Sequence, residues 1–387
     1  MAVLGDYIRI KHGFAFKGDY ITPDDNGVVL VTPVNFEIVG GFKEKKCKFF
    51  SAEYPKEYVL QAGDLIVTMT DLSKQSDTLG YSAIVPKSSR TYLHNQRIGL
   101  VDVFSPEAEK SYIYWFMRTQ KYQKTIVATA SGSTVKHTSP SRICAVEVDL
   151  PPIDEQRRVA SILDAMEKRI QSNNRINDNL QQQAQALYSS MFLENADLQT
   201  ISGLLKDIAE ITMGQSPRGS SYNEIGNGEV FYQGRAEFGY RFPTRRLYTT
   251  EPKRMAEAGD VLLSVRAPVG DLNVAYERCC IGRGLGAIHS RKGYSSFILY
   301  TMFALRSQLD VFNGDGTVFG SINRDALNEM PINIPSEEAI TIFENLVRPM
   351  DNIIRTNYEE TCRLQTLRDS MLPRLMSGEI DVSDIDL

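Results

Sequence analysis

The sequence predicts an α+β fold in which two similar mixed α/β globular modules are joined by two long helices that pair as a coiled coil. Three observations predict it: an internal repeat of about 185 to 200 residues, a long polar helix pattern after each copy, and a heptad spacing shared by both helix patterns. The expected boundaries are 1–150 for the first module, 151–195 for the first helix, 196–335 for the second module and 336–387 for the second helix.

The repeat is visible as short matching segments. Gly63-Asp64-Leu-Ile-Val-Thr68 is echoed by Gly259-Asp260-Val-Leu-Leu-Ser264, and both indicate a tight turn that leads into a short buried strand. Further matches follow later in each copy. They are Gly132-Ser-Thr-Val135 with Gly316-Thr-Val318, and Val148-Asp-Leu-Pro151 with Ile332-Asn-Ile-Pro335.

A long polar helix pattern without glycine follows the last proline of each module. Asp154 is suited to cap the first helix, which we expect to continue until Asn195. Its length of roughly 37 residues, or about 55 Å, is more than a single small domain usually needs. Two ordinary amphipathic helices on separate cores are the alternative, but this length favours pairing.

Apolar residues at 4-3-4-3 spacing define the pairing seam, and the seam of the second helix follows that of the first at a constant offset. Asn173 and Asn357 occupy the same step, and we interpret them as register markers that give up some stability for a defined alignment. The predicted seam residues are Leu163, Met166, Ile170, Asn173, Leu180, Leu187, Val347, Met350, Ile354, Asn357, Leu364 and Met371.

Pro349 lies within the second seam, where an interior proline costs about 3 kcal/mol. The sequence therefore predicts a break or kink, with the longer piece of the helix starting afresh at Pro349. Gly378 is expected to end this helix as a left-handed cap.

The charge balance excludes a protein that binds nucleic acid through a general basic surplus. Its 43 lysines and arginines against 48 acidic residues give a formal charge of -5, so any nucleic-acid surface must be local. The five cysteines have no CxxC spacing, which argues against a disulfide framework and a zinc site. No segment resembles a signal peptide or a membrane span, and we expect a cytoplasmic protein.

The sequence contains no recognisable catalytic motif. It lacks a GxxxxGK[ST] phosphate loop, and Gly282-Arg-Gly284-Leu-Gly286 has GxGxG spacing where a dinucleotide site needs GxGxxG. The four histidines lie far apart, which argues against a metal site. We therefore expect a non-catalytic chain that holds no cofactor and no metal.

A local basic run with interleaved aromatic residues lies between residues 235 and 254 of the second module, and the shorter basic stretch 42–48 corresponds to it in the first. Arginine guanidinium groups beside aromatic rings are suited to hydrogen bonds with phosphates and with base edges. The alternative is a solvated loop with a few ion pairs. The residues predicted to bind DNA are Lys43, Lys45, Lys46, Arg218, Arg235, Arg241, Arg245 and Arg246.

Several stretches carry a family resemblance. The most specific are Leu150-Pro-Pro-Ile-Asp-Glu-Gln156, with the helix start after it, and Leu367-Arg-Asp-Ser-Met-Leu-Pro-Arg-Leu-Met-Ser-Gly-Glu-Ile380; Gly13-Phe-Ala-Phe16 and Met213-Gly-Gln-Ser-Pro217 look like module openings. With the layout of the whole chain, they resemble the specificity subunit of type I restriction-modification systems. One departure is Ser336-Glu-Glu-Ala-Ile340, which replaces the fuller Pro-x-x-Glu-Gln start of the second helix.

The resemblance implies a subunit with two tandem target recognition domains, each reading one half of a split asymmetric target in double-stranded DNA. The two helices would pair in antiparallel fashion, which relates the two modules by an approximate two-fold. They would span the unread base pairs and carry the docking surface for partners. The implied partners are two methyltransferase subunits, which use S-adenosylmethionine to methylate adenine N6, and two restriction subunits, which use ATP and Mg. The specificity subunit itself would hold none of these cofactors.

The residues alone leave two other classes open. One is a non-enzymatic coiled-coil adapter whose two globular ends bind proteins. The other is a cofactor-dependent enzyme, against which the glycine spacing argues.

Overall fold

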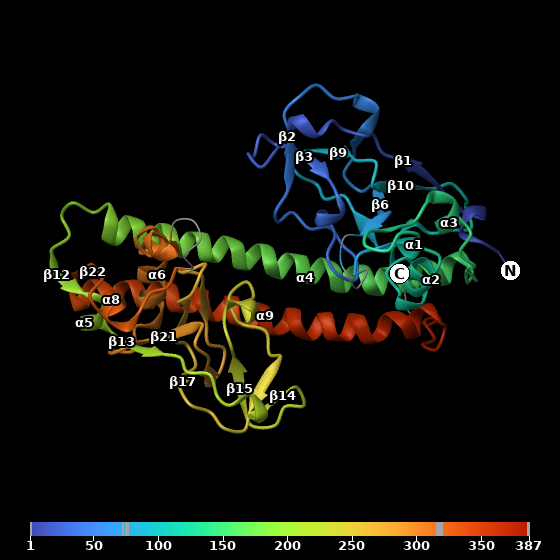
Figure 1. The fold of residues 1–387 in the computed structure, drawn as a ribbon. Coiled ribbons are helices and arrows are strands. Elements are labelled where there is room, and N and C mark those ends of the chain that lie inside the picture. Colours follow the sequence, from blue (N-terminus) through green and yellow to red (C-terminus); the bar gives the residue numbers. More distant parts are fainter. Residues whose placement is uncertain (1, 72, 74–76, 315–319, 385–387) are drawn as a thin grey trace. The chain divides into compact units, whose positions relative to one another are not determined.

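A computed structural model describes residues 2–71, 73, 77–314 and 320–384. Its chain divides into two compact units, the first made of Met1–Ser172 with Glu360–Leu387 and the second of Asn173–Glu359. Each unit therefore contains one globular module and a segment of each long helix (Figure 1). The predicted α+β fold, with two similar modules on two long helices, is confirmed.

The first unit contains a four-stranded sheet in the order β1-β10-β6-β8 and a five-stranded sheet in the order β2-β4-β3-β9-β5. Neighbouring strands are antiparallel except β3 and β9, which are parallel. A two-stranded ribbon pairs β7 with β11. The strands are β1 (Ile8–His12), β2 (Ile21–Thr22), β3 (Val28–Val31), β4 (Lys48–Phe50), β5 (Val59–Leu60), β6 (Leu65–Thr68), β7 (Thr70–Asp71), β8 (Ser82–Ile84), β9 (Thr91–His94), β10 (Ile98–Val103) and β11 (Lys136–His137).

The second unit repeats this strand order. Its four-stranded sheet runs β13-β21-β18-β19 and its five-stranded sheet β14-β16-β15-β20-β17, with β15 and β20 as the parallel pair. Strands β12 and β22 form a separate ribbon. The strands are β12 (Thr200–Leu204), β13 (Ala209–Met213), β14 (Tyr222–Asn223), β15 (Glu229–Tyr232), β16 (Leu247–Thr249), β17 (Met255–Ala256), β18 (Val261–Ser264), β19 (Leu272–Val274), β20 (Cys279–Ile281), β21 (Leu285–Ser290) and β22 (Pro331–Pro335).

Short helices cover the four-stranded sheet of each unit. They are α1 (Lys110–Phe116), α2 (Gln120–Ala128) and α3 (Pro140–Cys144) in the first unit, and α5 (Leu205–Ile208), α6 (Ser295–Ala304), α7 (Arg306–Asp310) and α8 (Arg324–Asn328) in the second. In both units one core lies between the two sheets, and a larger core lies between the four-stranded sheet, the short helices and the long helices. The modules thus share their layers as well as their strand order.

The two Gly-Asp segments form the predicted turns. Gly63 and Gly259 adopt left-handed φ values of 88° and 91°. In each turn the aspartate accepts a hydrogen bond from the backbone N–H three residues earlier, at 2.7 Å for Asp64 and 2.8 Å for Asp260. Residues 316–318, predicted to match the 132–135 segment, lie outside the described residues.

The long helices are α4 (Ile153–Tyr188), which ends in a π-helical turn at Ser189–Leu193, and α9 (Glu337–Met376). Because α4 begins at Ile153, Asp154 is a residue of its first turn and not the cap that we predicted. Gly378 follows α9 with a φ of 72°, as expected for a left-handed cap. Among the described residues, no helix is both long and apolar enough to span a bilayer.

Within each unit the helix segments pair in antiparallel fashion. In the first unit Arg169 Nε donates to Glu360 at 3.0 Å, and in the second Asn357 Nδ2 donates to Asn177 Oδ1 at 2.9 Å. Asn173 Nδ2 also reaches the backbone carbonyl of Asn357, at 3.5 Å. The twelve predicted seam residues are all buried or half-buried.

The predicted break at Pro349 is wrong, because α9 continues through this residue without interruption. Pro349 is exposed, so its ring faces away from the seam. Phe343 and Val347, on the buried face within the two turns before it, are fully buried in the larger core of the second unit. This packing offsets the roughly 3 kcal/mol that an interior proline costs.

Equivalent steps of the two long helices carry a carboxylate that binds an arginine of the adjoining module. Glu167 on α4 lies 3.8 Å from Arg118, which follows α1 and is buried. Asp351 on α9 pairs with Arg241, which lies in the loop after β15. The carboxylates are equivalent in the repeat, but the arginines come from different parts of their modules.

Candidate nucleic-acid interface

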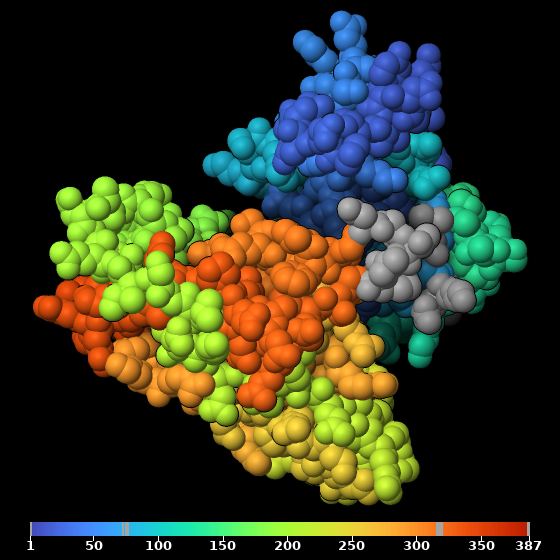
Figure 2. Space-filling model, turned by 60° about the vertical axis from the view of Figure 1, so that its left-hand side comes forward, coloured from blue at the N-terminus to red at the C-terminus, as the bar shows by residue number. Residues whose placement is uncertain are grey.

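Carboxylates of the second unit engage most of the predicted basic run. In Figure 2 the yellow-green to yellow surface that carries this run lies at one end of the visible part of the unit. The ion pairs are Arg235–Asp271 (3.1 Å), Arg245–Glu277 (2.5 Å) and Arg246–Glu237 (2.7 Å). A role of these three arginines in DNA binding stays a prediction. To contact DNA, each would first have to break its ion pair with a carboxylate of the unit.

Arg241 is only 4% exposed, in contrast to its neighbours in the run. Besides its ion pair with Asp351, it donates to Gln181 Oε1 at 3.2 Å and lies over the ring of Tyr300, 5.7 Å from the centroid. Both terminal nitrogens of its guanidinium therefore have partners inside the unit. The structure does not favour the predicted DNA contact at Arg241, because this side chain is buried and paired with Asp351 of α9. A count of nearby charges in the sequence could not show that pairing.

The remaining predicted DNA-binding residues lie on exposed loops or half-buried at their edges. Lys43 forms an ion pair with Glu37 at 3.5 Å. Lys45, Lys46 and Arg218 are exposed, and within the described residues their side chains have no ion pair or hydrogen bond. Their charges are available to an incoming ligand.

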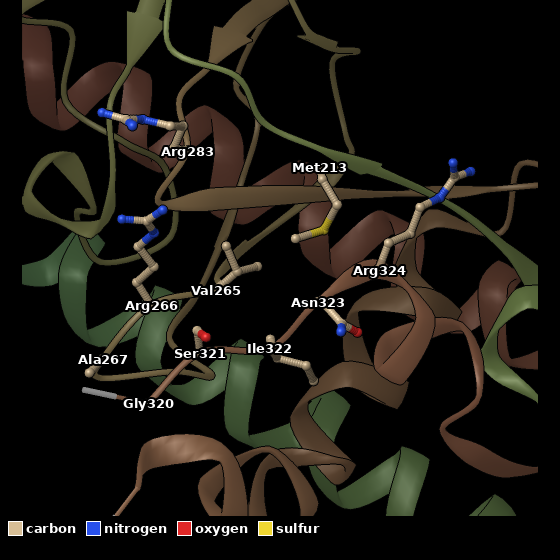
Figure 3. Close-up of a pocket in the computed structure, with 10 residues that line it drawn as sticks. All are labelled: Met213, Val265, Arg266, Ala267, Arg283, Gly320, Ser321, Ile322, Asn323 and Arg324. Carbon is tan, nitrogen blue, oxygen red and sulfur yellow. The ribbon is translucent and has the colours of Figure 1, made fainter. Parts of the chain in front are cut away.

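A pocket of about 610 Å³ in the second unit gathers three arginines that the sequence did not bring together (Figure 3). Arg266, Arg283 and Arg324 are all exposed, and among the described residues none has a side-chain ion pair or hydrogen bond. The described residues that line the pocket include no acidic residue. In Figure 3, Arg266 and Arg283 extend toward the same side, whereas Arg324 points away.

Backbone hydrogen bonds fix the base of this pocket. Val265, just after β18, donates its N–H to the carbonyl of Gly284 at 3.0 Å and accepts from the N–H of Ile322 at 3.1 Å. Arg266 forms an isolated antiparallel bridge with Ser321. Three segments far apart in sequence are thereby joined, and only the ends of the arginine side chains are left free to adjust.

The glycine-rich segment Gly282-Arg-Gly284-Leu-Gly286 has a packing role in this arrangement. A Cβ at Gly214 would lie 2.2 Å from the carbonyl oxygen of Gly282, and one at Gly282 would lie 2.7 Å from that of Gln233. Only glycine permits such close approach of two backbones. The segment holds Arg283 at the pocket wall, which accounts for its glycines without a dinucleotide.

The equivalent place in the first unit has different chemistry. The repeat aligns Thr70 with Arg266, and the β7·β11 ribbon takes the place of the single Arg266–Ser321 bridge. Thr70 Oγ1 lies 3.1 Å from His137 Nδ1. Thr70 is only 4% exposed, whereas His137 is exposed, so the first unit presents an imidazole where the second presents a guanidinium.

Asp71, which follows Thr70, binds backbone N–H groups of three described residues after β7. Its carboxylate is almost fully buried and accepts backbone N–H groups from Ser73 at 2.6 Å, Thr78 at 2.5 Å and Leu79 at 2.9 Å. Burial by itself raises the pKa of Asp71, but the hydrogen bonds from Ser73 and Thr78 outweigh it and hold the pKa below its ordinary value.

Replacing Asp71 with Asn should therefore lower stability by about 1 to 3 kcal/mol at pH 7, because buried N–H groups lose an acceptor. Because the pKa of Asp71 is lower in the folded than in the unfolded protein, its carboxylate stabilises the fold fully at pH values above the unfolded pKa of about 4. This stabilisation is lost as the pH falls through the folded-state pKa. The urea midpoints of wild type and variant should converge only below about pH 4. The exposed Asp102→Asn variant is the control, and a difference independent of pH would contradict the assignment.

No group of three or more histidine, cysteine, aspartate or glutamate side chains in the described part of the chain is arranged to hold a metal ion. The site consists of cations, hydroxyls and amides, which form hydrogen bonds to acceptor-rich ligands. The sequence signal that could have revealed this site is the position of its arginines relative to the repeat. Arg266 lies two residues after the second Gly-Asp segment, which ends at Ser264.

The chain matches the family model described as "Type I restriction modification DNA specificity domain" over residues 3–182 and 202–360. The two matched stretches coincide with the two copies of the repeat and parts of both long helices.

Similar proteins carry related descriptions. The putative type I restriction enzyme MjaX specificity subunit of Methanocaldococcus jannaschii is 28% identical over 346 residues, which cover 84% of this chain and 80% of that protein. The type I restriction enzyme HindI specificity subunit of Haemophilus influenzae is 22% identical over 344 residues, with coverages of 68% and 75%. The crystal structure of a type I restriction-modification S subunit from M. genitalium aligns over 96% of this chain and 94% of that chain, with a TM-score of 0.62 and 14% identity, and shares the fold.

Proposed function

The chain belongs to the type I restriction-modification DNA specificity family, and from this premise we propose how its two units divide the recognition of DNA. As a family member the chain is a DNA-recognition subunit without catalytic activity of its own. Methylation of adenine N6 and cleavage of DNA are carried out by partner subunits. Membership decides against the protein-binding adapter and against a cofactor-dependent enzyme.

Each unit reads one half of a bipartite target. The observation that carries this proposal is the repeated strand order with different chemistry at equivalent places, an exposed imidazole in the first unit and a set of exposed arginines without partners among the described residues in the second. Two modules of one architecture can approach DNA in the same manner. Different side chains on that shared scaffold then select different bases.

The DNA contacts that we propose are five of the exposed cations without partners among the described residues. In the second unit they are Arg218, Arg266 and Arg283, and in the first Lys45 and Lys46. Unpaired cations supply the salt-dependent part of DNA affinity, because phosphate contacts release condensed counterions. Cations already bound to buried acids, such as Arg241, position the module instead.

The proposed partners are two methyltransferase subunits, which bind S-adenosylmethionine, and two restriction subunits, which use ATP and Mg, in a cytoplasmic complex. An exposed apolar stripe on α9 supports docking on the helix pair. Its members in the second unit are 47–50% exposed and recur at spacings of four and seven residues: Ile342, Leu346 and Ile353. Such a stripe on a long helix fits a partner helix.

Replacing both Leu346 and Ile353 with Glu is expected to weaken binding of the methyltransferase subunit by about 2 kcal/mol or more, roughly 30-fold. The stripe would lose apolar burial and bring two carboxylates into the contact. Pull-down or titration calorimetry measures the loss. The Asn345→Glu, Asn352→Glu variant adds the same charges to neighbouring exposed positions, and equal weakening by both variants would contradict a specific role of the stripe.

Methylation mapping tests the proposed function. Genomic DNA from cells that carry this chain and its methyltransferase subunit is compared by single-molecule sequencing with DNA from cells that lack only this chain. We expect a split motif with N6-methyladenine on both strands, which disappears when the chain is deleted. Unchanged methylation with an active methyltransferase would refute the proposal.

A further inference from the structure

We propose that Arg266 and Arg283 read the major-groove edge of a guanine in the half of the target that the second unit recognises. The inference rests on the proposed function and adds the base and the residues. It starts from two guanidiniums that line one pocket of about 610 Å³ and extend toward the same side of it (Figure 3). Like charges in one pocket repel each other, and an acceptor-rich ligand removes that repulsion.

The donor set of the pocket selects among the four bases. Arg266 and Arg283 present hydrogen-bond donors and no acceptor, and no carboxylate of the described lining supplies one. Guanine offers two adjacent acceptors, O6 and N7, on its major-groove edge, whereas adenine and cytosine present an amino donor there. A guanidinium group, which can only donate hydrogen bonds, therefore favours guanine and disfavours adenine and cytosine.

The surroundings of the arginines favour a base over a phosphate. Met213, Val265 and Ile322 form an apolar part of the lining beside the cations, and two of them are almost fully buried. A phosphate stays strongly hydrated and gains nothing from apolar surface. A base edge combines acceptors with apolar ring atoms, and the neighbouring pyrimidine can contribute a methyl group.

The backbone beneath the two arginines is already fixed in the free protein. The Arg266–Ser321 bridge holds one, and the hydrogen bond from the Arg283 N–H to Ser216 Oγ, at 3.2 Å, holds the other. Only the side chains have to be ordered on binding. Fixed Cα positions are what a base-specific contact requires, because its geometry tolerates little displacement.

The test uses the full chain, assembled with its methyltransferase subunits, and duplex DNA that carries the target from methylation mapping. Each guanine of that target is replaced in turn by 7-deazaguanine, which lacks the N7 acceptor. At one guanine we expect wild-type affinity to fall by about 5- to 150-fold. Arg266→Ala and Arg283→Ala should show a comparable loss on natural DNA and lose little more with 7-deazaguanine at that position. Their methylated motif should become degenerate there.

Arg278→Ala is the matched control, because it removes an arginine of the same unit that is paired with Glu229 at 2.9 Å. It should leave affinity and motif unchanged, and thermal melting verifies that all variants fold. Uniform weakening on all sequences with an unchanged motif would identify phosphate contacts and overturn the guanine assignment, as would variants without effect. If wild-type DNA binding is not sequence-selective, the proposed function itself fails.

Discussion

Replacing Asp351 with Ala is expected to destabilise the second unit by about 3 to 5 kcal/mol. Its partner Arg241 is 4% exposed, and removing one member of a buried ion pair leaves the other charge desolvated without compensation. Tyr300 would lose a partner as well, since its hydroxyl donates to Asp351 Oδ1 at 3.0 Å. Thermal melting and limited proteolysis of the unit measure the loss.

The double variant Arg241→Leu, Asp351→Leu is the companion experiment. Replacing both charges with apolar groups removes the desolvation cost, so most of the stability should return. If the double variant is as unstable as Asp351→Ala, the ion pair is not the origin of the effect and local packing is.

Replacing Ile170 with Asp is expected to separate the helix segments of the first unit. Ile170 is 4% exposed on α4, so the new carboxylate would be buried without a partner and an apolar contact would be lost, a cost of about 3 to 5 kcal/mol. If the methyltransferase docks on the helix pair, as proposed, assembly with it should fail too. Urea unfolding and co-purification measure these two effects.

Ser172→Asp is the control for this substitution, because it adds the same charge at an exposed position two residues further along α4. It should fold and assemble like the wild type. Assembly of Ile170→Asp at the wild-type level would refute the seam assignment at this step.

Much of the fold could be predicted because it depends on periodic and local signals. The seam of α4 and α9 follows a heptad spacing over many turns, and the Gly63 and Gly259 turns need a residue that tolerates positive φ. Pro349 shows where such reasoning ends. Propensity predicts a break, whereas burial of Phe343 and Val347 on the opposite side keeps the helix continuous.

The interface was harder to predict, since its charges are decided by contacts between distant segments. Arg245 looks free in sequence, but Glu277 lies 2.5 Å from it in the fold. Conversely, Arg266 and Arg283 stand singly in sequence, and only the hydrogen bonds around Val265 bring their segments to one pocket. A count of charges along a short stretch of sequence detects neither the ion pair of Arg245 with Glu277 nor the approach of Arg266 and Arg283 to one pocket.

The equivalent carboxylates Glu167 and Asp351 bear on how such chains can evolve. In both units the helix supplies the anion and the module supplies the cation, Arg118 in one case and Arg241 in the other. A module inserted by recombination at either position brings its own arginine and meets an acid already in place. These ion pairs do not involve Arg218, Arg266 or Arg283, so a change at the proposed DNA contacts would leave both attachment points intact.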